Sequence, residues 1–134
     1  MELHLNIIGF TLIPLGLIHA IFPSYFNWKT ELQPLSLVNR QMMIVHTFFI
    51  ALAVILMGLL CVTSANELVD TPLGQKICLG MGFFWTCRFF IQFFGYSKKL
   101  WKGKQFETIV HVVFSCYWLY LSVVFLMIGF QQAS

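Results

Sequence analysis

The sequence predicts an all-α integral membrane protein, a four-helix up-down bundle that forms a single domain over residues 1–134. Of these 134 residues, 59% are hydrophobic and only 10% are charged, whereas soluble domains carry about 25% charged residues. A helix needs about 20 mostly apolar residues to cross the hydrocarbon core of a bilayer. Four segments meet this need, and we expect membrane spans at about 5–22, 43–62, 77–94 and 109–130.

The distribution of basic residues predicts the orientation of the bundle. Basic loops stay preferentially in the cytoplasm, and the connection that holds Lys29 and Arg40 lies on the same side as the lysine-rich loop 97–105. The other side has only Lys76. We therefore expect loop 97–105 to be cytoplasmic and both termini to be outside, in the inner or plasma membrane if the cell is bacterial. The net charge of +3 is then a topology signal and gives no reason to expect a nucleic-acid partner.

The first span carries small residues on one face. Gly9 and Gly16 lie seven residues apart, and Leu12 and His19 continue the same helical stripe. Small residues let helices approach closely in lipid, so we expect this stripe to be the packed face. Pro23 follows and is expected to end the span, because proline cannot continue the hydrogen-bond ladder of a helix.

The second span is preceded by polar residues. Ser36 is a candidate N-cap residue, because its side chain can accept a hydrogen bond from the first turn. His46 shares a helical stripe with Asn39 and Ala53. Arg40 comes early enough for its side chain to reach the interface.

The third span combines aromatic residues with two inward-facing polar candidates. Arg88 and Gln92 are four residues apart and share a face with Gly95. Arg88 is the one basic residue well inside a predicted span, where a charge is expensive and needs a partner or a function. The aromatic residues are distributed around the helix: Phe83, Phe84, Trp85, Phe89, Phe90, Phe93 and Phe94.

The fourth span carries a polar stripe on an otherwise apolar helix. Glu107, His111, Ser115, Trp118 and Ser122 follow one another at intervals of three or four residues, which places them on one face. Lipid offers no hydrogen-bond partners, so this face should pack against protein or line a cavity.

Polar side chains from all four spans lie at a similar expected depth. With a rise of about 1.5 Å per residue, His19 and His46 lie about 6 Å inside the cytoplasmic ends of their spans, and Gln92 and His111 about 7.5 Å. Arg88 lies at about 13.5 Å, and its long side chain can bend back toward the same layer. We therefore expect a polar site in the cytoplasmic half of the bundle.

Three histidines at one depth favour haem b or a single transition-metal ion as the bound group. Imidazole is the commonest protein ligand for transition metals and also binds haem iron. A metal ion would use His19, His46 and His111, with Glu107 as a fourth group. A haem would use two of the three histidines, and its other contacts are expected from Arg40, Arg88, Gln92 and Trp85. Such a protein would serve in electron transfer or in a metal-dependent redox step.

Two alternatives come from other functional classes. In the first, the chain is a non-catalytic accessory or assembly subunit of a larger membrane complex or a homo-oligomer. Its histidines then form a hydrogen-bonded polar cluster or hold an organic ligand such as a quinone, a pigment or a lipid. In the second, the polar stripe that starts at Glu107 is a proton relay or part of a carrier. Whether the protein is an enzyme stays open, because no nucleophile and base pair stands out. Four cysteines without a CxxC motif argue against a thiol oxidoreductase and a zinc ribbon.

Overall fold

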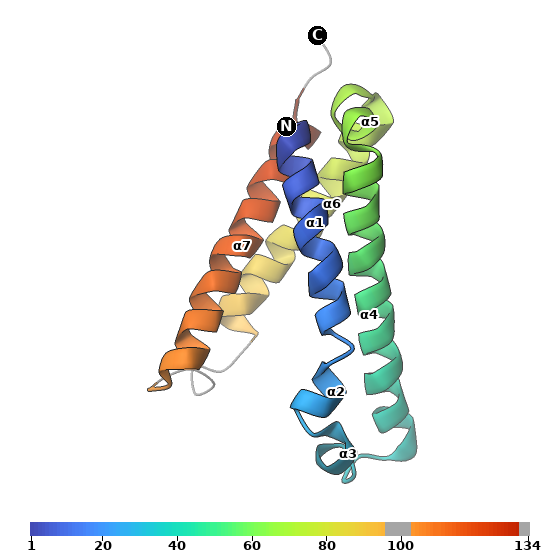
Figure 1. Ribbon diagram of the computed structural model, residues 1–134, viewed down its shortest axis with the longest axis vertical. Helices are drawn as coiled ribbons and strands as arrows, with labels where there is room; N and C mark the ends of the chain where they lie inside the picture. Colours follow the sequence, from blue (N-terminus) through green and yellow to red (C-terminus); the bar gives the residue numbers. More distant parts are fainter. Residues whose placement is uncertain (96–102, 132–134) are drawn as a thin grey trace. The chain divides into compact units, whose positions relative to one another are not determined.

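The computed structural model describes residues 1–95 and 103–131, and these residues are helical with no strand among them (Figure 1). The chain divides into two compact units, an N-terminal unit (Leu3–Ala65) and a C-terminal unit (Asn66–Ser134 with Met1–Glu2). Most of loop 97–105, which is predicted to be cytoplasmic, lies outside the described residues. The helices are α1 (Glu2–Ile18), α2 (Phe22–Tyr25), α3 (Trp28–Glu31), α4 (Leu37–Thr63), α5 (Ala65–Asp70), α6 (Pro72–Phe94) and α7 (Gln105–Gly129).

Three of these helices are long and apolar enough to cross a membrane. They are α4 with 27 residues, α6 with 23 and α7 with 25. The all-α class is confirmed in the described residues, and the apolar surface of these helices indicates a lipid environment. The first predicted span is different, because α1 has 17 residues and at about 1.5 Å per residue it extends only about 25 Å.

The end of α1 comes four residues before the end of the predicted span. After Ile18 the backbone switches to the tighter bonds of a turn, from the His19 N–H to the Gly16 carbonyl at 3.2 Å and from the Ile21 N–H to the Ile18 carbonyl at 2.9 Å. Pro23 then lies in the first turn of α2, where its missing N–H costs nothing. The prediction that Pro23 ends the first span is therefore wrong, because the helix breaks after Ile18 and Pro23 begins the next helix.

Close helix approach builds the N-terminal unit, in which α1 and α4 run side by side (Figure 1). A Cβ atom added to Gly9 would lie 2.6 Å from the carbonyl oxygen of Gly58, and one added to Gly16 would lie 2.9 Å from that of Ala51. Small residues seven apart on each helix thus face each other in antiparallel register. The expected packed face of α1 is confirmed at Gly9, Gly16 and the fully buried Leu12.

Side-chain caps mark where α4 and α6 begin. The Ser36 hydroxyl accepts a hydrogen bond from the Asn39 N–H at 3.3 Å, which confirms the predicted N-cap. Thr71 caps α6 in the same way, with its hydroxyl 2.9 Å from the Gly74 N–H. The segment 64–75 contains α5 and the first turn of α6, and the Thr71 cap satisfies a backbone N–H at the start of α6.

The C-terminal unit is an antiparallel hairpin of α6 and α7 (Figure 1). A Cβ atom on Gly82 would lie 2.7 Å from the side chain of Leu126, and one on Gly129 would lie 2.8 Å from the backbone nitrogen of Leu79. Larger groups lie further along the pair, toward the start of α7. The larger groups are aromatic and polar, and they form the candidate site.

Candidate functional site

The polar stripe of α7 packs against protein along most of its length. Ser115, Trp118 and Ser122 are buried, with exposed fractions of 8%, 5% and 5%. Each serine hydroxyl donates a hydrogen bond within its own helix, Ser115 to the His111 carbonyl at 2.7 Å and Ser122 to the Trp118 carbonyl at 2.8 Å. The expectation that this face avoids lipid is confirmed for these residues. Glu107 in the first turn of α7 is exposed.

A chain of hydrogen bonds joins α6 to α7. The Arg88 guanidinium donates from Nη1 to Oε1 of Gln92 at 3.1 Å, and Nε2 of Gln92 lies 3.0 Å from Nδ1 of His111. Gln92 is only 7% exposed, so its amide depends on these partners. The spacing of Arg88 and Gln92 predicts that they share one face, and in the structure this face contacts the polar stripe of α7.

The direction of these bonds fixes the tautomer of His111. A guanidinium can only donate, so it holds the oxygen of the Gln92 amide and leaves the amide NH₂ facing His111. Nδ1 of His111 must then accept, and in the neutral imidazole the proton sits on Nε2. In this arrangement His111 offers a metal ion no lone pair until the hydrogen bond to Gln92 is broken or the proton moves.

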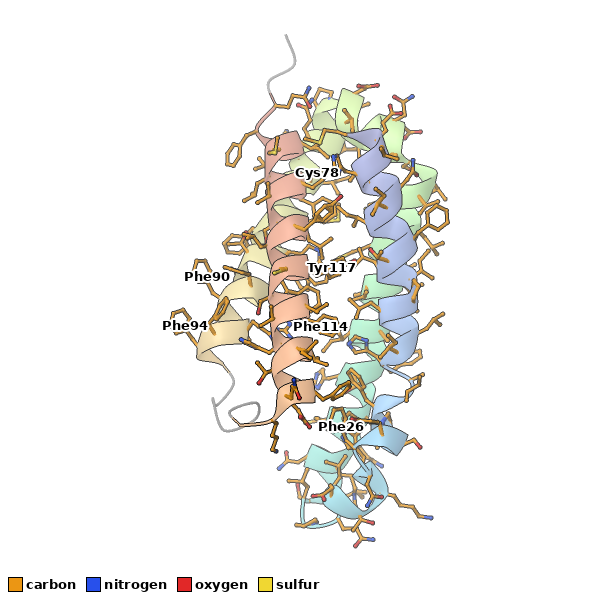
Figure 2. All side chains as sticks on the ribbon, turned by 60° about the vertical axis from the view of Figure 1, so that its left-hand side comes forward. Phe26, Cys78, Phe90, Phe94, Phe114 and Tyr117 are labelled. Carbon is orange, nitrogen blue, oxygen red and sulfur yellow. The ribbon has the colours of Figure 1, made fainter. Side chains whose placement is uncertain are left out.

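Two stacked indoles lie beside this chain. The rings of Trp85 and Trp118 are 5.1 Å apart and inclined by 9°, and the Arg88 guanidinium lies 5.0 Å from the centroid of the Trp118 ring. This is cation–π geometry, which is worth more away from water. The ring of Phe114 stacks on that of Trp118, with 5.5 Å between the ring centroids. Figure 2 shows Phe114 on α7, about one helical turn before Tyr117.

The indole nitrogens of both tryptophans are buried and have no hydrogen-bond partner within residues 1–95 and 103–131. Trp85 and Trp118 lie near the middle of α6 and α7, whereas tryptophans of membrane proteins concentrate at the interfaces, where the indole N–H finds partners. Trp118 appeared in the predicted polar stripe but was not expected to be a site residue. Its position at the depth of Trp85 on a neighbouring span is the signal that identifies it.

The other predicted ligands lie in the N-terminal unit. Nδ1 of His19 lies 2.9 Å from the Leu15 carbonyl, and a carbonyl can only accept, so Nδ1 carries the proton and the lone pair is on Nε2. Its ring also contacts Phe22 at 4.8 Å. His46 is exposed, and Arg40 is half-buried in the first turn of α4. The predicted set is thus divided between units: His19, His46 and Arg40 in one, and Trp85, Arg88, Gln92, Glu107 and His111 in the other.

Metal binding receives no support from side-chain clustering. Among the residues that the structure describes, no group of three or more His, Cys, Asp or Glu side chains is placed to hold a metal ion. The convergence of His19, His46 and His111 stays a prediction. What the structure brings together is Trp85, Arg88, Gln92, His111 and Trp118, which we call the hairpin cluster.

The bond between Gln92 and His111 is expected to contribute about 1 kcal/mol to stability, within the range measured for hydrogen bonds between membrane helices. A double-mutant cycle of Gln92→Met and His111→Leu, followed by unfolding in mixed micelles of mild detergent and dodecyl sulfate, measures this coupling. Thr86→Val is the matched control, because the Thr86 hydroxyl donates within its own helix to the Gly82 carbonyl at 2.7 Å. Its coupling to His111→Leu should be near zero. Equal coupling in both cycles would contradict the bond.

Comparison of the chain with protein-family models, with curated proteins and with solved structures finds no match.

Proposed function

We propose that this chain is a non-catalytic subunit of a larger membrane complex, in which the hairpin cluster ties α6 to α7. The proposed architecture is the four-helix up-down bundle, with both termini outside and loop 97–105 in the cytoplasm. The observation that carries the proposal is the bonding of Arg88, Gln92 and His111 to one another. Polar groups that are bonded to each other stabilise a helix pair in lipid, and they need no substrate to be satisfied.

The aromatic surface of α6 supports a protein partner. Phe83, Phe90 and Phe94 are 71%, 53% and 82% exposed, and Figure 2 shows Phe90 and Phe94 projecting from α6. Aromatic side chains bury large areas and dominate many protein interfaces.

Purification in mild detergent tests this proposal. The wild-type protein is expected to elute with a fixed partner at a constant ratio, determined by native mass spectrometry. Replacing Phe83, Phe90 and Phe94 by leucine keeps the helix apolar but removes the rings, and should release the partner. The matched control replaces Phe48 and Phe49, exposed aromatic residues of α4, by leucine and should leave the complex intact. A wild-type protein that elutes as a monomer would contradict the proposal.

A second candidate function is the binding of haem b or a transition-metal ion, and the geometry of His19 favours it. Histidines that bind metals usually donate their other ring N–H to a carbonyl or carboxylate, as Nδ1 of His19 does to the Leu15 carbonyl at 2.9 Å. The further ligands proposed are His46, His111 and Glu107, and His111 would first have to give up its hydrogen bond with Gln92.

The visible spectrum of the purified protein, oxidised and reduced, tests the second candidate together with metal analysis. A haem protein should show a Soret band that His19→Ala weakens, while His4→Ala, at the opposite end of α1, leaves it unchanged. A colourless protein without stoichiometric metal removes this candidate and leaves the subunit proposal untouched.

A further inference from the structure

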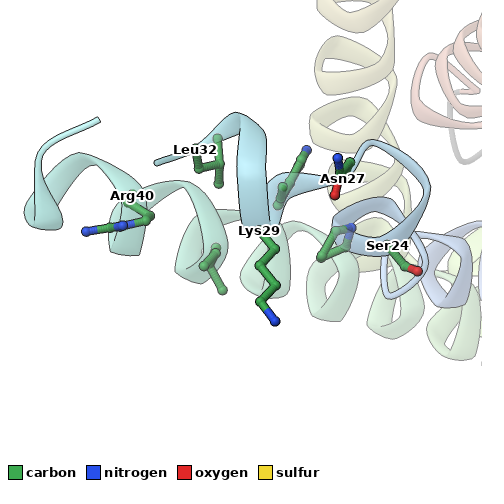
Figure 3. A pocket seen from close by; sticks show the side chains of 8 residues that line it. Ser24, Asn27, Lys29, Leu32 and Arg40 are labelled. Carbon is green, nitrogen blue, oxygen red and sulfur yellow. The ribbon is translucent and has the colours of Figure 1, made fainter. Parts of the chain in front are cut away.

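A pocket of about 660 Å³ lies in the N-terminal unit, and none of the residues that line it belongs to the hairpin cluster (Figure 3). Three segments contribute to its wall: α2 and the turn after it, α3, and the first two turns of α4. Asn27 makes the turn between α2 and α3 possible, because its φ of 53° lies in the left-handed region that asparagine tolerates better than most residues. The pocket is independent of the proposed subunit function.

The pocket wall is positively charged. Lys29 and Arg40 both line it, and they are the only Lys or Arg residues between Leu3 and Ala65. Glu31 is the only carboxylate in that unit, and it is not among the lining residues. Two cations and no anion in one concave surface attract a negatively charged group.

The remaining polar groups of the pocket can donate hydrogen bonds to the same kind of group. The Ser24 hydroxyl, the Asn27 amide and the Trp28 indole N–H are donors, and Figure 3 shows Ser24 and Asn27 on the same segment as Lys29. A phosphate offers several acceptor oxygens and is well matched to guanidinium. The heads of Lys29 and Arg40 lie apart in Figure 3, and the rotatable stem of the lysine allows it to move toward a bound anion.

The part of the pocket wall that α4 contributes includes an apolar side chain as well as a cation. The 27 residues of α4 extend about 40 Å, about 10 Å more than the hydrocarbon core. At least one end of α4 therefore reaches the headgroup layer. Arg40 lies in the first turn of α4, and Ile44, one turn further along, also lines the pocket. The wall thus passes from cations to apolar side chains over about 6 Å.

We propose that this pocket binds a phosphate group, with Arg40 and Lys29 neutralising its charge and Ser24 and Trp28 donating hydrogen bonds. The phosphate belongs to the headgroup of an anionic lipid or to a soluble phosphate. The apolar side of the pocket, at Ile44, suits the acyl chains of a lipid.

Calorimetric titration of the detergent-solubilised protein tests the proposal. The probes are short-chain phosphatidic acid, short-chain phosphatidylcholine and inorganic phosphate. Phosphatidic acid is expected to bind saturably, and phosphatidylcholine, whose choline offsets the phosphate charge, more weakly. Arg40→Gln and Lys29→Gln should each weaken phosphatidic acid binding about tenfold, since each removes a charge-assisted hydrogen bond. Lys76→Gln, which removes an exposed lysine of the C-terminal unit, is the matched control and should leave binding unchanged.

The two sources of phosphate give different results. If inorganic phosphate binds as tightly as phosphatidic acid, the ligand is a soluble phosphate. If only the lipid binds, the ligand is a headgroup. Both results support the phosphate site, provided that Arg40→Gln weakens binding. The proposal is overturned if no probe binds the wild-type protein saturably, if Arg40→Gln and Lys29→Gln bind like the wild type, or if added salt leaves phosphatidic acid binding unchanged. The salt titration uses wild-type protein and therefore does not depend on the folding of any variant.

Discussion

Gly9→Ala is expected to destabilise the contact between α1 and α4 by about 2 kcal/mol. The added methyl carbon would lie 2.6 Å from the Gly58 carbonyl oxygen and 3.1 Å from the Val62 nitrogen. Both atoms belong to the backbone of α4, so neither can rotate away as a side chain could. The helices must separate, and the packing that holds them in lipid is lost along the whole contact. Unfolding in mixed micelles of mild detergent and dodecyl sulfate measures the change.

Gly80→Ala provides the control for this prediction. The same methyl group at Gly80, an exposed position of α6, has no atom within 4 Å. Alanine is the better helix former by about 1 kcal/mol, so this variant should be unchanged or slightly more stable. If Gly9→Ala and Gly80→Ala unfolded at the same fraction of dodecyl sulfate, the close approach of α1 and α4 would be contradicted.

Helical pattern was enough to predict the faces that pack. Gly9 and Gly16 lie seven apart on a short apolar helix, and few arrangements other than close approach to a neighbour explain two such glycines in lipid. The polar stripe from His111 to Ser122 predicts a protected face by the same logic, because unsatisfied polar groups are expensive in hydrocarbon. These inferences need only the period of the helix and the nature of the solvent.

Partners across helices could not be predicted in the same way. The expected depth places His19, His46 and His111 in one layer, although depth says nothing about direction around the helix axis. Gln92 of α6 lies within hydrogen-bond distance of His111, although the sequence predicts Gln92, at the same expected depth, as a cofactor contact. The sequence pattern also does not predict the residue at which α1 ends. The turn that follows Ile18 depends on backbone hydrogen bonds, which an apolar sequence does not reveal.

Trp118→Ala is expected to cost about 3 kcal/mol of stability, the usual loss for a large buried aromatic residue. Trp118 is 5% exposed, stacks on Trp85 at 5.1 Å and has the Arg88 guanidinium over its face. Its removal leaves a cavity at the centre of the hairpin and takes away the ring beside the charge. Phe48→Ala, which truncates a 62% exposed ring on α4, is the control and should cost much less. The same unfolding measurement compares the two variants.

Trp118→Phe tests whether the hairpin cluster only ties α6 to α7 or also donates a hydrogen bond from the Trp118 indole to another group. Phenylalanine keeps a flat ring for Trp85 and Arg88 but has no N–H. Because the indole nitrogen of Trp118 has no partner among the described residues, its loss breaks no hydrogen bond among them, and the variant should lie within about 1 kcal/mol of the wild type. Such a result fits a cluster that only ties the helices together. If Trp118→Phe instead cost as much as Trp118→Ala, the N–H would be donating to a group outside the described residues. The proposal that the cluster only ties the two helices together would then have to be abandoned.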